Sequence, residues 1–228
     1  FASNNRRLII QNSRPEDSGT YTCSVINRAG ETSVDFVVNI VSEPKIDGSR
    51  NDPEPYVVEG RSKTLWCMID GHPKPEIKWL KDGAEIPSDV MADFELIENG
   101  QGLSVRDALP KHSGKYTCVA ENTVGTTEYD VSLDIWTMPA VNVTGPDEVK
   151  QNNPLVLFCN VTGNPTPTLQ WLLNSQPLII GPNNYWTVSA DGTRLERAQM
   201  TESQVGRYTC TARNEAGSAE SHLEVGIL

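Results

Sequence analysis

Long apolar runs and clustered basic residues are both missing from this sequence of 228 residues. The longest apolar runs, such as Phe36-Val37-Val38, are only a few residues long, whereas a membrane-spanning helix needs about 20. Arg6-Arg7 is the only basic doublet, and the formal net charge is −11. The short apolar runs predict no direct insertion into a membrane. Because binding to phosphate or sulfate groups requires clustered Lys and Arg, we also expect no nucleic acid partner and no heparin.

Spacings that would hold a metal ion or build a catalytic centre are also missing. There is no Cys-x-x-Cys pair, and His72, His112 and His222 lie far apart in the sequence. The densest acidic run matches no calcium-binding loop, so we expect it to be a solvated surface; it contains Asp89, Asp93, Glu95 and Glu98. The sequence therefore predicts no metal, no cofactor and no catalytic residues, and the protein is not expected to be an enzyme.

What the sequence does contain is a repeat built on cysteine, tryptophan and tyrosine. In each complete copy a Trp lies 12 residues after the first Cys, and a second Cys lies 51 residues after the first Cys. A Tyr lies two residues before that second Cys. The residues are Cys67, Trp79, Tyr116 and Cys118 in one copy, and Cys159, Trp171, Tyr208 and Cys210 in the next. Identical spacing without an insertion indicates two copies of one fold.

Residues 1–41 correspond to the second half of a further copy. Tyr21 and Cys23 match the Tyr and second Cys, and Leu8 and Ile10 match a strand that precedes them. Since the chain starts at Phe1 and this copy has no first half, we interpret the sequence as an internal segment. Half a sandwich exposes its core face, so we expect residues 1–41 to be poorly packed and Cys23 to have no partner within the copy.

The motif Gly-x-Pro-x-Pro-x-Ile/Leu-x-Trp, followed by Gly-x-Tyr-x-Cys and Asn-x-x-Gly, resembles the I-set branch of the immunoglobulin superfamily. The resemblance covers essentially the whole chain. It implies an all-β fold of tandem immunoglobulin-like sandwiches, the first of them incomplete. The expected domains are residues 1–41, with strands E to G only, residues 44–135, and residues 139–228.

The same resemblance implies roles for the repeated residues. Cys67 would pair with Cys118, and Cys159 with Cys210, each disulfide linking two facing sheets across a core tryptophan, Trp79 or Trp171. Tyr116 and Tyr208 would form a tyrosine corner, with the phenol bonded to nearby backbone. Each disulfide would close a loop of 51 residues and contribute about 4 kcal/mol. Retained cysteine pairs point to an oxidising compartment.

Strand alternation and proline positions give further expectations. Leu65 and Cys67 should face inward, which directs Trp66 to solvent or to a neighbouring domain. We expect Trp136, near a domain end, to be exposed as well, where a neighbouring domain or a partner could cover either tryptophan. Pro44 should end the strand before the first junction, and Pro139 lies in a second, very short junction. Arg197 falls where the other copies have an apolar inward residue. Its charge must therefore reach solvent, or its strand must be shifted.

Two glycosylation sequons lie in the last copy. They are Asn142-Val143-Thr144 and Asn160-Val161-Thr162. Asn160 follows an inward cysteine and should face out, which would make it accessible. If the protein is secreted, the sequence favours modification of Asn142, near the start of the domain.

The short linkers, the regular period and the retained cysteine pairs are most similar to the tandem arrays of the hemicentin family of the extracellular matrix. This resemblance implies adhesion and matrix assembly at basement membranes. The repeats would act as semi-rigid spacers and bind other matrix or cell-surface proteins, homophilic contacts included. Contactin-like and roundabout-like receptors, perlecan-like matrix proteins and the muscle titin group use similar modules. A receptor ectodomain is thus the alternative, and a cytosolic muscle array the third choice.

Overall fold

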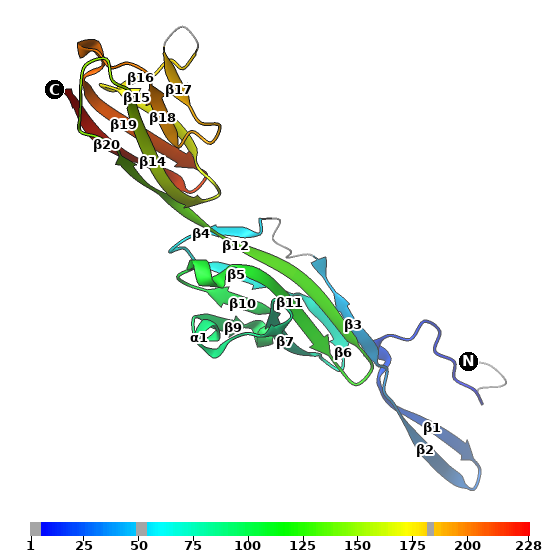
Figure 1. The fold of residues 1–228 in the computed structure, drawn as a ribbon. Coiled ribbons are helices and arrows are strands. Elements are labelled where there is room, and N and C mark those ends of the chain that lie inside the picture. Colours follow the sequence, from blue (N-terminus) through cyan, green and yellow to red (C-terminus); the bar gives the residue numbers. More distant parts are fainter. Residues whose placement is uncertain (1–5, 49–53, 182–184) are drawn as a thin grey trace. The chain divides into compact units, whose positions relative to one another are not determined.

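The computed structural model describes residues 6–48, 54–181 and 185–228, and strands dominate it (Figure 1). The chain divides into two compact units, residues 1–55, 63–105 and 114–132 in the first, and residues 56–62, 106–113 and 133–228 in the second. The expected all-β fold is confirmed. One short helix, α1 (Ser88–Met91), and several 3-10 turns lie between the strands.

The strands of the first two copies are short except where hairpins form. They are β1 (Gly19–Asn27), β2 (Gly30–Val38), β3 (Ser42–Ile46), β4 (Tyr56–Val58), β5 (Lys63–Trp66), β6 (Ile69–His72), β7 (Glu76–Lys81), β8 (Ala84–Glu85), β9 (Phe94–Ile97), β10 (Gly102–Val105), β11 (Gly114–Glu121) and β12 (Thr126–Thr144).

The last copy holds the remaining strands. They are β13 (Glu148–Val149), β14 (Leu155–Asn164), β15 (Thr168–Leu173), β16 (Gln176–Pro177), β17 (Trp186–Val188), β18 (Arg194–Arg197), β19 (Gly206–Asn214) and β20 (Gly217–Ile227).

Strands β1 and β2 form a two-stranded antiparallel sheet of their own. Within these strands only Tyr21 and Val38 are partly covered, while apolar residues such as Phe36 are exposed. This agrees with the poor packing expected of residues 1–41. Leu8 and Ile10, however, are not in a strand. In the complete copies the equivalent strands β10 and β18 pair with β5 and β14, and the described part of the first copy, residues 6–41, contains no counterpart of those partners.

In the middle copy, two layers of strands enclose a core. One sheet has the order β5-β10-β9, and β12, β11, β7 and β8 follow one another in another sheet. Leu65, Leu103 and Val105 are buried on the first sheet, and Trp79 and Cys118 on the second. The period-2 pattern read from the sequence, with Leu65 and Cys67 inward, is therefore confirmed.

The last copy is a two-layer sandwich (Figure 1). One layer has the order β17-β18-β14-β12, and the other has the order β13-β20-β19-β15-β16. Its core is a single buried cluster, and residues from both layers contribute: Val143, Leu155, Leu157, Cys159, Trp171, Trp186, Leu195, Met200, Tyr208, Cys210 and Val225 are among its members.

The two junction prolines lie inside strands, so the expectation that Pro44 ends the preceding strand is wrong. That strand, β2, already ends at Val38, and Pro44 is buried within β3. Pro139 is likewise buried within β12, which continues through the second junction. A strand can hold a proline only where no ladder bond is required of its nitrogen. Each proline accordingly falls at a register shift, between Ser42 and Lys45 in β3 and between Thr137 and Ala140 in β12.

Candidate contact surfaces

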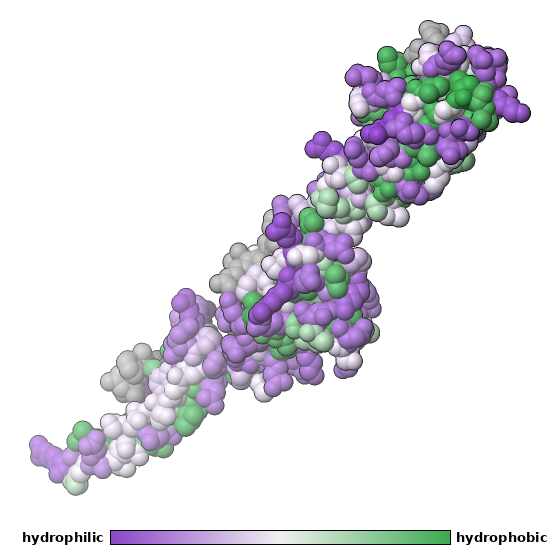
Figure 2. All heavy atoms as spheres, turned by 90° about the vertical axis from the view of Figure 1, so that its left-hand side faces the viewer, coloured by the Kyte–Doolittle hydropathy of each residue, from purple (hydrophilic) through white to green (hydrophobic). Residues whose placement is uncertain are grey.

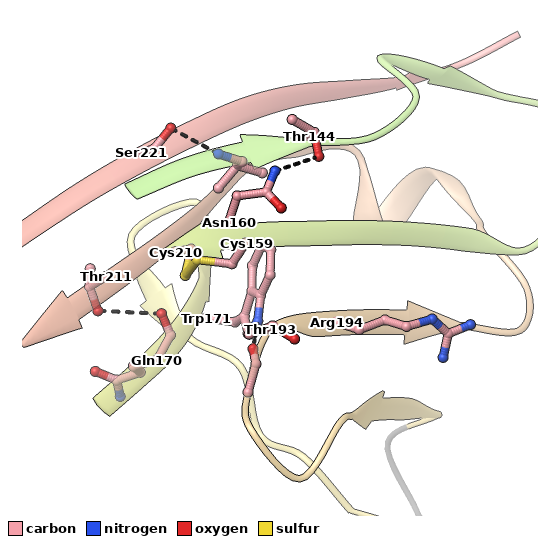
Figure 3. The surroundings of a disulfide bond; sticks show 12 residues. Thr144, Cys159, Asn160, Gln170, Trp171, Thr193, Arg194, Cys210, Thr211 and Ser221 are labelled. Atoms are coloured by element: carbon pink, nitrogen blue, oxygen red, sulfur yellow. Dashed lines mark hydrogen bonds between the residues drawn. A yellow bond between two sulfur atoms is a disulfide. The ribbon is translucent and has the colours of Figure 1, made fainter. Parts of the chain in front are cut away.

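The cysteines and tryptophans form the same group in both complete copies. Cys67 is bonded to Cys118 with a Cα–Cα distance of 6.3 Å, and Cys159 to Cys210 with 6.2 Å. Each tryptophan is buried and donates from Nε1 to a glycine carbonyl: Trp79 to Gly100 at 2.8 Å, and Trp171 to Gly192 at 2.9 Å. Figure 3 shows the second group, with the indole beside the disulfide. A buried indole N–H needs such an acceptor, and in each complete copy a glycine in a turn provides it.

The corner before the second cysteine is also repeated. Tyr21 donates to the carbonyl of Asp17 at 2.7 Å, and Tyr208 donates to that of Gln204. Tyr116 and Tyr208 are fully buried, and burial raises the pKa of both phenols above the usual value near 10. Two buried phenols of raised pKa stay neutral at physiological pH and serve packing, not proton transfer.

One position in this corner changes its residue type but keeps its bond. The side chain of Asp17 accepts from the backbone N–H of Arg14 at 2.8 Å, and Nδ1 of His112 accepts from that of Leu109 at 2.9 Å. In the last copy Gln204 accepts from Thr201 at 3.0 Å. Carboxylate, imidazole and amide thus perform one structural task. His112 is fully buried in that task, which argues against a catalytic histidine at this corner.

The Asn-x-x-Gly motif clamps the opposite end of each complete copy. Nδ2 of Asn214 donates to the carbonyls of Thr137 and Pro165, both at 2.9 Å. Its Oδ1 accepts from Ala216 at 3.0 Å and from Gly217 at 3.1 Å. Asn122 makes the same set of bonds in the middle copy, to Ser42, Pro73, Val124 and Gly125.

A glycine makes room for each clamp. A Cβ on Gly163 would lie 3.0 Å from the Pro167 ring and 3.2 Å from the Cα of Pro139. Gly71 is equally confined by Pro75 and Pro44. The Gly-x-Pro-x-Pro motif therefore encodes a close approach of three backbone segments, and it is not a ligand site.

The two tryptophans expected to be exposed are half-buried instead. Trp136 stacks on Tyr56 with ring centroids 3.6 Å apart and donates from Nε1 to Asp134. Trp66 covers Gly102, where a Cβ would lie 2.9 Å from the indole. Strand alternation did direct both side chains away from the core. The prediction missed their local partners, because a cross-strand aromatic and a glycine opposite an indole are visible only once the register is known.

Arg197 keeps its inward position without a shift of its strand. It lies opposite Leu155 in the β14–β18 ladder, and its guanidinium carbon is 5.1 Å from the ring centroid of Trp186. Its Nε also donates to the carbonyl of Gln199. Of the two alternatives in the sequence, the packed stem with a solvent-reaching charge is the one observed.

Both sequon asparagines are exposed on the outer face of the same sheet. Asn142 in β12 and Asn160 in β14 are direct cross-strand partners, and Nδ2 of Asn160 donates to Oγ1 of Thr144 at 3.3 Å. Figure 3 shows the Asn160 side chain directed at Thr144, while Cys159 points to Cys210. The two sequons are separated along the chain, but strand pairing brings them together.

On the face that Figure 2 shows, polar side chains alternate with apolar groups. Exposed ion pairs lie on the sheet faces, among them Lys115–Asp130 at 2.6 Å and Arg207–Glu224 at 2.8 Å. Ile179 and Tyr185 are the most exposed large apolar side chains among the described residues of the last copy, at 74% and 71%. Neither residue was predicted as a surface feature, although the apolar run from Leu178 to Ile180 beside Gly181 is visible in the sequence.

Metal-binding clusters and membrane-spanning helices are both absent from the part of the chain that the structure describes. Among residues 6–48, 54–181 and 185–228, no group of three or more His, Cys, Asp or Glu side chains is placed to hold a metal ion. Within those same ranges, no helix has the length and apolar character needed to cross a membrane. The free cysteine of the described chain, Cys23, is exposed on the β1–β2 hairpin.

Two-layer sandwiches with a cystine against a buried tryptophan define the class of immunoglobulin-type repeat proteins. The chain belongs to the immunoglobulin I-set domain family, whose model matches residues 1–40, 50–135 and 141–227. The resemblance read from the Gly-x-Pro-x-Pro, Tyr-x-Cys and Asn-x-x-Gly motifs is thereby confirmed.

The chain is similar to hemicentin-1 of Mus musculus, with 32% identity over 99% of the chain and 4% of the relative. It also resembles the muscle M-line assembly protein unc-89 of Caenorhabditis elegans, with 28% identity over 96% of the chain and 3% of the relative. A solved three-domain fragment of titin, I67–I69, matches with a TM-score of 0.73 and 24% identity, covering 95% of this chain and 76% of that one. The chain thus spans only a few per cent of the length of hemicentin-1 and of unc-89.

Proposed function

We propose that this chain is a non-enzymatic segment of an extracellular adhesion or matrix protein. Its repeats, with domains at residues 1–41, 44–135 and 139–228, act as semi-rigid spacers and as modules that contact other proteins. The contacts use sheet faces and edge strands, because the repeated motifs are engaged in holding the sandwiches together. The similarity to hemicentin-1 over 99% of the chain supports this function.

The observation that carries the proposal is the pairing of all four cysteines of the complete copies. Both disulfides are buried next to a tryptophan, and each supports a whole sandwich. Such bonds persist in secreted and cell-surface proteins and are rare in the reducing cytosol. The pairing therefore favours matrix or cell surface over a cytosolic array.

One observation favours a second candidate. The similarity to unc-89, a muscle assembly protein by name, supports the hypothesis that the chain is a segment of a cytosolic muscle protein. In that compartment Cys67, Cys118, Cys159 and Cys210 would be reduced, and the sandwiches would depend on packing alone. The receptor ectodomain shares the oxidised state with the matrix protein, so the flanking sequence of the full-length protein distinguishes those two.

Differential alkylation of the protein from its native source tests the proposal. Free thiols are blocked first, disulfides are then reduced and labelled, and peptides containing Cys67, Cys118, Cys159 and Cys210 are quantified. Oxidised peptides are expected for all four. Reduced peptides in freshly extracted protein would overturn the extracellular proposal and support the muscle segment.

A further inference from the structure

The outer face of the β12–β14 ladder carries an aromatic ring that the core does not explain. Phe158 is 45% exposed, although it lies in the middle of β14. It alternates with the buried Leu157 and Cys159, so it shares the outward face of the strand with Asn160, two residues further on. A single exposed phenylalanine is ordinary by itself, so a cover for this ring is inferred only from the residues that surround it.

The sequon residues surround this ring. Thr144 is the direct cross-strand partner of Phe158, and Asn142 is the partner of Asn160. The surface is hollowed at this point by a depression of about 540 Å³, and residues lining it include Ala140, Asn142, Phe158, Asn160 and Thr162. Both acceptor asparagines and the aromatic ring therefore border one open hollow on one sheet face.

We propose that an N-linked glycan on Asn160 occupies this hollow and packs its first sugar against the ring of Phe158. Side chains two apart on one strand face lie about 7 Å apart, within reach of the first sugar ring. The apolar C–H face of a hexosamine fits an aromatic surface, and covering the ring removes apolar area from water. Asn142 borders the same hollow from the opposite strand.

The covalent step uses a lipid-linked pyrophosphate oligosaccharide as donor. Nδ2 of Asn160 bonds to C1 of the first sugar, the bond from C1 to the pyrophosphate oxygen breaks, and that oxygen leaves with its electron pair. The amide loses one of its two protons, which balances the charge on the leaving pyrophosphate. The attached amide nitrogen keeps its second hydrogen.

One consequence concerns the contact surface. A glycan on this face closes the β17-β18-β14-β12 sheet of the last copy to protein partners. The other sheet, with the order β13-β20-β19-β15-β16, would then be the face of this copy that is available for contacts. This inference rests on the proposed extracellular function, because only the secretory pathway supplies the donor.

A double-mutant cycle on the whole chain, secreted from a mammalian cell line, tests the inference. All proteins carry Asn142→Gln, so that one sequon remains. Thr162→Ala then removes that sequon while leaving Asn160 and its bond to Thr144 in place, and Phe158→Thr removes the ring. Mass spectrometry is expected to find glycan on Asn160 wherever Thr162 is retained.

The glycan is expected to raise the Tm of the last copy by about 3 °C when Phe158 is present and by less than about 1 °C in the Phe158→Thr chain. Ring-current upfield shifts of the first-sugar protons, measured by NMR, provide a readout independent of stability and should vanish with Phe158→Thr. An unoccupied Asn160, an equal Tm increment in both backgrounds, or sugar shifts unaffected by Phe158→Thr would overturn the inference. Because the secretory pathway is imposed, these outcomes are independent of the thiol state in the native source.

Discussion

The β1–β2 hairpin of the first copy and the β19–β20 hairpin of the last copy have the same local hydrogen bonds, but only the second hairpin contributes buried residues. In both, a tyrosine hydroxyl bonds to a backbone carbonyl four residues earlier, and an asparagine side chain accepts from the turn that follows it. Yet β1 and β2 are almost wholly exposed, whereas Tyr208 and Cys210 in β19 are fully buried. Turn and corner geometry is thus encoded locally, while burial requires the facing sheet.

The disulfide provides the largest expected difference between the two regions. The double change Cys159→Ala and Cys210→Ala should lower the unfolding free energy of the last copy by about 4 kcal/mol, because the unfolded chain loses a closed loop of 51 residues. Urea unfolding followed by hydrogen exchange and mass spectrometry assigns the loss to its segment. Cys23→Ala is the matched control and should change stability by less than about 0.5 kcal/mol, since Cys23 is exposed. A comparable loss from Cys23→Ala would contradict the comparison.

The asparagine clamp should distinguish the same regions. Asn214→Asp keeps the acceptor for Ala216 and Gly217 but replaces the donor to two carbonyls with an oxygen that repels them. We expect a loss of about 2 to 3 kcal/mol, measured as faster amide exchange in β19 and β20. The matched change Asn27→Asp retains the acceptor for Ala29 and Gly30, and exchange in β1 and β2 should remain as it is. Equal responses in both hairpins would show that the clamp does not depend on the second sheet.

The corner acceptor offers a subtler test, because three residue types occupy it. His112→Ala should lower the stability of the middle copy by about 2 kcal/mol, since the Leu109 N–H loses its acceptor and a cavity is left. His112→Gln supplies the acceptor that Gln204 provides in the last copy and should cost less than half as much. Thermal unfolding of both variants beside wild type measures the difference. Two equally destabilised variants would mean that the shape of the imidazole, and not its Nδ1 acceptor, stabilises the corner.

Much of the fold was accessible from sequence because its signals are short-range. The Cys–Trp–Tyr–Cys spacing carried the resemblance that implied the Cys67–Cys118 and Cys159–Cys210 disulfides and the core position of Trp79, and strand alternation placed Cys67 inward. The predictions at Leu8 and Pro44 failed for a different reason. Whether residues 8–10 form a strand depends on a partner strand, and whether Pro44 ends a strand depends on a register shift, and neither is a property of the local sequence.

The surface was less predictable than the core for the same reason. Each sequon was visible in the sequence, and alternation placed Asn160 outward. That Asn142 lies opposite it, with Phe158 in the same hollow, follows only from the β12–β14 register. Trp136 shows the same limit, because its stacking on Tyr56 depends on the parallel pairing of β4 with β12.

The smallest expected effect concerns the turn at residues 189–194 of the last copy. The Oδ1 atom of Asp191 accepts from Ser189 Oγ, Thr193 N and Thr193 Oγ1. These bonds, with that from Ser189 the largest contribution, lower the pKa of Asp191 from its ordinary 3.8 to about 2. A lowered folded-state pKa favours the folded turn above pH 4, and this contribution is lost as the pH falls through 2.

Carboxyl carbon NMR should therefore find a titration midpoint near 2 for Asp191. The protection factors of the Thr193 and Arg194 amides, which are exchange rates corrected for the intrinsic rate at each pH, should fall over the same pH range, because their bonds to Asp191 and Ser189 loosen together. Asp191→Asn retains an acceptor oxygen that does not titrate, so this variant should keep its protection factors as the pH falls. If the protection factors of the variant and wild type fall alike, the turn opens through global unfolding of the sandwich, and the bonds of Asp191 are not its determinant.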